Sequence, residues 1–128
     1  MQPALVVSSY RLDDAVVLRM TGDLTGDTLA ALKAILGRVE PILDRLLHDR
    51  FGVLVIDLAA LQACDLSGLA VLSAISDAAR NAGVEPRLAA APGRIRTLLA
   101  DSQLGDRVAQ FGTVHGAARD DPGDLVMH

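Results

Sequence analysis

Hydrophobic positions along the chain follow two spacings, one typical of strands and one typical of helices. Apolar runs at residues 5–10, 16–21, 53–58, 87–91 and 107–111 predict strands. Apolar residues three and four positions apart predict helices at 29–47, at 66–82 and at 94–100, with a brief last helix at 114–119. This order predicts an α/β domain: a mixed, mainly parallel β-sheet of about five strands with helices packed mainly on one face.

The first two predicted strands are joined by residues 11–15, a connection short enough for a hairpin, so we expect them to be antiparallel neighbours. Residues 22–25 then break the strand pattern. Pro41 lies inside the apolar stripe of the long helical segment, so the sequence predicts either a kink or two helices. The stripe is expected to face the core, and its surplus length is a candidate surface for a partner or a homodimer.

The stretch from residue 53 to residue 82 predicts a strand, a turn and a helix in direct succession. Residues 53–58 are apolar on both faces, which is typical of an interior strand. The turn spans residues 62–68, and the helix ends at Gly83. The helix positions expected to face the core are Leu69, Leu72, Ile75 and Ala79. The positions expected to lie largely off that face are Ser73, Ser76, Asp77 and Arg80.

Ser67 is therefore expected in the first turn of a helix. The first four amides of a helix lack internal partners and carry the positive end of its dipole, so an anion on Ser67 would be stabilised. A phosphoryl group would bring about −1.5 to −2 charges and three acceptor oxygens. A purely structural interpretation is also open, in which Asp65 caps the helix, Ser67 is compatible with its start and Gly68 permits close packing.

The order of a strand that ends at Asp57, a short loop and the motif Asp-Leu-Ser-Gly-Leu at residues 65–69 resembles the signature of STAS domains, specifically of the anti-sigma factor antagonists (anti-anti-sigma factors). In that family the usual motif is Asp-Ser-Ser-Gly-Leu, and the serine before the glycine is phosphorylated by an anti-sigma factor that is also a kinase. The resemblance places that serine at Ser67. The chain departs from the family at Leu66, which excludes a second acceptor there.

The segment Gly-Asp-Leu-Thr at residues 22–25 resembles the family's Gly-Glu-Leu-Asp corner, with Thr25 in place of the usual acid. Since that corner lies near the phosphorylated serine in the family, the resemblance makes Asp23 a candidate acid beside the site, and a loop or capping role for it is equally open. The segment at 37–50 is about two helical turns longer than in comparable members. The implied partner-binding residues are Asp23, Asp65, Leu66, Ser67, Gly68 and Leu69.

The resemblance implies a bacterial, cytoplasmic protein that regulates transcription, as in a stress response. The unmodified chain would bind an anti-sigma factor and release its sigma factor, and phosphorylation of Ser67 by that serine kinase, which carries the ATP, would switch it off. Such a chain is not an enzyme and needs no cofactor. Two alternatives stay open, neither controlled by Ser67 phosphorylation: a STAS scaffold or sensor module, and a small-anion-binding domain.

Composition narrows the function classes. A net charge of −4, with one tyrosine and two phenylalanines as the aromatic residues, argues against nucleic-acid binding. No apolar run approaches the roughly 18 residues that cross a bilayer, and no signal-like start is visible, so we expect no membrane attachment. The chain is expected to form one STAS domain over residues 1–119, followed by a flexible C-terminal tail at 120–128.

Motifs of common enzymes are missing from the sequence. A receiver domain with Asp57 as phosphoacceptor would need a second acidic pair and a lysine after the last strand, but Lys33 lies in the first helical segment. A serine hydrolase would need Ser67 in a Gly-x-Ser-x-Gly elbow with a histidine nearby, but residues 66–69 have only the following glycine. The histidines lack ligand-like neighbours, so no metal site is expected. Cys64 is expected to be a buried small hydrophobe, with a reactive thiolate as the alternative.

Overall fold

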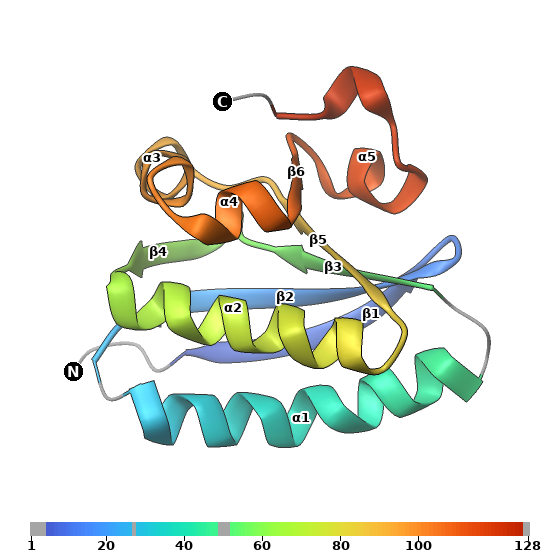
Figure 1. Ribbon diagram of the computed structural model, residues 1–128, viewed down its shortest axis with the longest axis horizontal. Helices are drawn as coiled ribbons and strands as arrows, with labels where there is room; N and C mark the ends of the chain where they lie inside the picture. Colours follow the sequence, from blue (N-terminus) through green and yellow to red (C-terminus); the bar gives the residue numbers. More distant parts are fainter. Residues whose placement is uncertain (1–4, 27, 49–51, 127–128) are drawn as a thin grey trace.

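The computed structural model describes residues 5–26, 28–48 and 52–126. The strands of this part are β1 (Val6–Leu12), β2 (Ala15–Leu24), β3 (Val53–Asp57), β4 (Leu61–Cys64), β5 (Glu85–Ala89) and β6 (Ala109–Phe111). The helices are α1 (Thr28–His48), α2 (Leu66–Asn81), α3 (Gly93–Ala100), α4 (Gln103–Arg107) and α5 (Val114–Arg119), followed by a 3-10 turn, η1 (Pro122–Asp124). Figure 1 shows their arrangement.

The strands form a mixed sheet in the order β1-β2-β3-β5-β6. β1 and β2 are an antiparallel hairpin, as expected, whose tight turn has Asp13 in the left-handed region at φ 53°. The pairs β2–β3, β3–β5 and β5–β6 are all parallel, which places the apolar strand β3 in the interior. The predicted α/β architecture is therefore confirmed.

Helices cover the two faces of the sheet unequally. One large apolar cluster joins α1, α2, α3 and α4 to one face, with Val39, Leu72 and Leu99 among its fully buried members. A smaller cluster on the other face packs Ala117 of α5 against Val55 and Phe111. α1 and α2 lie side by side along the sheet (Figure 1). The prediction of helices mainly on one face holds, with α5 as the exception among the described helices.

The end of β2 and the strand β4 differ from the prediction. β2 continues through Gly22 to Leu24 instead of breaking, and β4 forms within the predicted turn. A register shift between Gly22, at φ 109°, and Asp23 lets β2 bend away from β3 and pair with β4 in parallel. This short ladder was missed because four residues carry little periodic signal.

α1 is a single helix through Pro41, so the alternative with two helices is wrong. Pro41 and the preceding turn at Gly37 are exposed, so water can satisfy the carbonyl group that the proline leaves without a donor. The predicted stripe is buried at Ile35, Val39 and Leu43. Leu36 and Ile42 of the stripe are half-buried and pack against the core, and its leucine side chains at positions 29, 32, 46 and 47 lie outside the described side chains.

The core face of α2 is confirmed at all four predicted positions, but the placement of Ser76 off that face is wrong. Ser76 is fully buried, and its hydroxyl donates a hydrogen bond of 2.9 Å to the carbonyl oxygen of Leu72. A serine can be buried inside a helix because a backbone carbonyl one turn earlier accepts its proton.

The C-terminal segment differs from the expected flexible tail over residues 120–126. The backbone N–H of Gly112 donates to the carbonyl oxygen of Asp124 at 2.9 Å, and that of Val126 donates to Gln110 at 2.8 Å. The carboxylate of Asp124 also accepts from the N–H and the hydroxyl of Thr113, which caps α5. The segment therefore covers the outer edge of β6, while residues 127 and 128 lie outside the described part.

Candidate partner-binding site around Ser67

The start of α2 is fixed by a capping interaction. Asp65 has extended backbone angles, and its Oδ1 accepts a hydrogen bond of 2.9 Å from the N–H of Gly68. Its carbonyl oxygen accepts from the N–H of Leu69 at 2.9 Å. The predicted role of Asp65 as helix cap is confirmed, and Ser67 is the second residue of the helix.

Gly68 is buried where the ends of β2 and β4 meet the helix. A Cβ atom at this position would lie 2.7 Å from Sγ of Cys64 and closer still to the carbonyl oxygen of Leu24. Real side chains do not tolerate such distances, so only glycine lets the helix approach the strands this closely. The predicted close packing at Gly68 is confirmed.

Cys64 and Leu69 flank the cap on either side and join the same apolar cluster. This pairing of the residue before the cap with the fourth helical residue is a hydrophobic staple, which fixes the angle at which the chain enters the helix. Burial, with a smaller contribution from the charge of Asp65, raises the pKa of the Cys64 thiol to about 11. The thiol is therefore protonated near neutral pH, which favours the small-hydrophobe interpretation over a reactive thiolate.

The predicted binding residues divide into a buried and a surface group. Gly68 and Leu69 are buried, so they position the helix and do not face solvent. Asp65 is exposed, Ser67 is half-buried and Leu66 has 76 % of its surface exposed. A docking protein would therefore meet Asp65, Leu66 and Ser67.

Asp23 lies on β2 opposite Ala63 of β4, so the structure brings its strand to the start of α2. Its neighbour Leu24 points into the core that carries α2, and successive side chains of a strand point to opposite faces. Asp23 is half-buried, and no hydrogen bond joins it to Ser67 in the part of the chain that the structure describes. Asp23 is therefore brought near the start of α2 by its strand and not by a hydrogen bond to Ser67.

Asp57 ends β3 in a buried position with 5 % of its surface exposed. Its Oδ1 accepts a hydrogen bond of 3.0 Å from the N–H of Ala59, which fixes the turn toward β4. Within the described residues, no group of three histidine, cysteine or acidic side chains is placed to hold a metal ion. Among the same residues, no helix is long and apolar enough to cross a membrane.

The STAS domain family model matches residues 7–117 of the chain. The chain therefore belongs to the STAS domain family. A search of curated protein sequences gives no match.

Solved structures with the same fold include two anti-sigma factor antagonists. The antagonist from Mycobacterium paratuberculosis is 19 % identical, with 91 % of this chain and 93 % of that chain covered and a TM-score of 0.65. The Bacillus cell fate determinant SpoIIAA in its phosphorylated form is 16 % identical, with 91 % and 98 % covered and a TM-score of 0.61. The NMR structure of the protein TM1081 is 17 % identical, with 88 % and 85 % covered and a TM-score of 0.67. At these identities the similarity concerns the fold.

Sequence reasoning missed one part of the site, namely the contact of β4 and the end of β2 with the start of α2. Two residues of the sequence could have indicated it. One is the apolar Leu61, which the structure buries almost fully, and the other is Gly22, which allows the bend in β2. Both lie in stretches that read as loops because they are short.

Proposed function

We propose that this chain is an anti-sigma factor antagonist that is switched off by phosphorylation of Ser67. In its unmodified form it binds an anti-sigma factor with serine kinase activity and so releases the sigma factor. The observation that carries the proposal is the half-exposed position of Ser67 as the second residue of a helix capped by Asp65, next to the exposed Leu66.

The helix start is suited to carry a phosphate without unfolding. At this start, the amide of Gly68 is bonded to the Asp65 side chain, and the amide of Leu69 makes the first hydrogen bond within the helix, to the Asp65 carbonyl oxygen. The amides of Leu66 and Ser67 are left, among the described residues, to face an anion. The charge of Asp65 opposes part of this stabilisation, because two negative groups lie close together.

The same phosphate disrupts a docked partner. It places about −1.5 to −2 charges and considerable bulk in a packed contact, where neither is accommodated. A loss of about 2–3 kcal/mol would weaken binding about 30- to 150-fold. The chain itself performs no catalysis in this scheme and holds no cofactor, because the kinase supplies the ATP. It acts in the bacterial cytoplasm and touches neither nucleic acid nor membrane.

The family membership and the two antagonist structures with the same fold support this choice over other binding functions. One of those structures, SpoIIAA, was solved in a phosphorylated form. The alternative role as a STAS scaffold predicts assembly that does not depend on the state of Ser67.

Binding of Ser67 variants to purified anti-sigma factors of the source organism that carry a serine-kinase ATPase domain tests the proposal. Wild type and Ser67→Ala are expected to bind one of them, and Ser67→Asp is expected to bind at least 30-fold more weakly. Mass spectrometry after addition of ATP should find phosphate on the peptide that contains Ser67. Ser9→Asp, at an exposed serine of β1, is the control and should bind like wild type. Equal binding by all variants, with Ser67 unmodified, would contradict the switch.

A further inference from the structure

Leu66 exposes more of its surface than any other large hydrophobic side chain whose burial the structure describes. Its exposed fraction is 76 %, against 55 % for Val6, 44 % for Tyr10 and 39 % for Leu125. The fold makes no use of this side chain, since the cap is made by Asp65 and the staple by neighbouring residues. A polar residue would serve the first helical position equally well and would avoid exposed apolar area.

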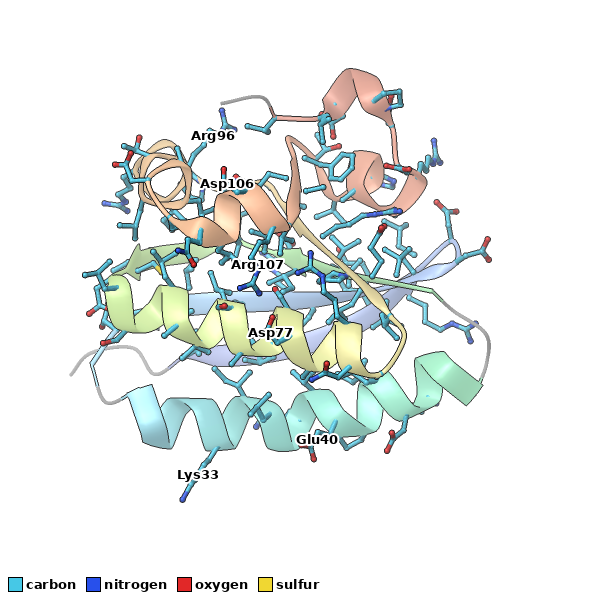
Figure 2. All side chains as sticks on the ribbon, in the orientation of Figure 1. Lys33, Glu40, Asp77, Arg96, Asp106 and Arg107 are labelled. Atoms are coloured by element: carbon cyan, nitrogen blue, oxygen red, sulfur yellow. The ribbon has the colours of Figure 1, made fainter. Side chains whose placement is uncertain are left out.

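Beyond Leu66, the solvent-facing side of α2 carries only short, uncharged side chains over two turns. Residues 66, 70, 73 and 77 share one side of the helix, because eleven positions correspond to about three turns. Ala70 is exposed and Ser73 is half-buried, so no long side chain rises from this strip before Asp77. At Asp77 the strip ends in an ion pair with Arg107 of α4. Figure 2 shows these two labelled side chains between α2 and α4.

Leu66 is also held in place. The hydrogen bond from Gly68 to Asp65 and the close packing of Gly68 against Leu24 fix the turn on which it stands. Because the backbone at Leu66 is already fixed, binding does not have to order it, which favours a role as an anchor. Anchors of this kind sit in pockets at the centre of an interface, surrounded by contacts that exclude water.

We infer that Leu66 is the apolar anchor that selects the partner of this chain: it inserts into an uncharged pocket, lined by aliphatic or aromatic side chains, on the anti-sigma factor. This inference rests on the proposed function and adds the chemistry of the contact. Because the side chains of Ala70 and Ser73 are short, the rim of that pocket can approach α2. A phosphate on Ser67 would add about −1.5 to −2 charges beside that of Asp65 at the edge of this apolar pocket, which explains the effect of the switch.

Titration calorimetry with the purified anti-sigma kinase tests this assignment. Leu66→Gln keeps the size of the side chain and its helix propensity but makes it polar, and it is expected to weaken binding about tenfold. Leu66→Met, which stays apolar and adapts its shape, should bind within about threefold of wild type. Val6→Gln is the matched control, since Val6 is exposed on β1, and should not change the affinity.

Phosphorylation kinetics separate an anchor from a structural role. Loss of an anchor that acts before and during phosphoryl transfer raises KM for this chain and leaves kcat unchanged. A lower kcat, or a shifted unfolding curve, would mean that Leu66→Gln disturbs the helix start, and would overturn the assignment. Unchanged affinity in Leu66→Gln, with Ser67→Asp still failing to bind, would overturn the anchor alone. If no anti-sigma kinase binds wild type, the proposed function fails and the anchor with it.

Discussion

Replacement of Gly68 by alanine is the most direct perturbation of the contact between α2 and the sheet. The added Cβ would lie 2.7 Å from Sγ of Cys64 and closer to the backbone oxygen of Leu24. Ordinary contacts between such atoms are about 3.5–4.0 Å, so the helix start must move by about 1 Å. Because one of the two obstacles is backbone, rotation of a side chain cannot relieve the clash.

The expected net effect is a loss of stability of about 2 kcal/mol. Overpacking of this kind costs about 1–3 kcal/mol, and backbone obstruction places Gly68→Ala at or above the upper end. Alanine in a helix returns up to about 1 kcal/mol relative to glycine. With a shift of about 4 °C per kcal/mol for a domain of this size, the midpoint of thermal unfolding should fall by about 8 °C.

Gly37→Ala in α1 is the matched control, because a Cβ at Gly37 would meet no atom within 4 Å. It should stabilise the domain by about 0.5–1 kcal/mol, since only helix propensity changes. Urea unfolding of both variants, followed by circular dichroism, gives the two free energies of unfolding on one scale. If Gly68→Ala is as stable as Gly37→Ala, then α2 does not pack on β2 as described and the reasoning about the site is refuted.

Further predictions concern the cap, the thiol and the C-terminal segment. Asp65→Ala should lower the free energy of unfolding by about 1 kcal/mol, whereas Asp65→Ser should retain most of it, as measured by urea unfolding, because serine still accepts from the helix N–H groups. The thiol of Cys64, whose pKa is about 11 against 9.0 for an ordinary thiol, should react with Ellman's reagent at pH 8 about 100-fold more slowly in the folded protein than in urea. Since that pKa is raised by folding, its contribution to stability is complete below pH 9 and is lost as the pH rises toward 11, which unfolding curves recorded across this range should show. Asp124→Ala should cost about 1–2 kcal/mol, because Thr113 loses the acceptor of its N–H and hydroxyl, whereas Asp121→Ala, which loses one exposed bond to Gly123, should cost less.

The elements that could be predicted from the sequence are those with a long periodic pattern. The buried strand β3 and the core face of α2 carry several apolar residues at regular spacing, so their identity followed from local pattern alone. The cap at Asp65 was equally readable, because an acid before an apolar helix has a defined physical role. These three features place Ser67 at the start of a helix, and the resemblance of residues 65–69 to the STAS motif made it the candidate site.

The features that escaped prediction depend on contacts between segments far apart in the sequence. β4 forms because the bulge at Gly22 turns the end of β2 toward it. The sequence of residues 61–64 alone does not indicate that β2 is their pairing strand. The carboxylate of Asp124 accepts a hydrogen bond from Thr113, and it occupies space that side chains at positions 112 and 116 would fill if these residues were not glycines. The proline and the acidic residues of this segment are typical of a flexible tail, so its composition gave no indication of the hydrogen bond to Thr113.

The first turn of α2 separates the residues that stabilise the fold from those that face solvent. Gly68 and Leu69 are buried and, together with the Asp65 cap, hold the turn, whereas Leu66 is exposed and Ser67 is half-buried. A negative charge on Ser67 therefore lies away from the contacts that stabilise the fold, and it lies near the positive end of the helix dipole. Ser67→Asp should leave the free energy of unfolding unchanged or raise it by about 0.3–1 kcal/mol, measured by urea unfolding, even though it is expected to weaken partner binding at least 30-fold. A clear loss of stability in Ser67→Asp would show instead that the charge acts by loosening the helix start, and the switch would then be a local unfolding event and not a change of surface.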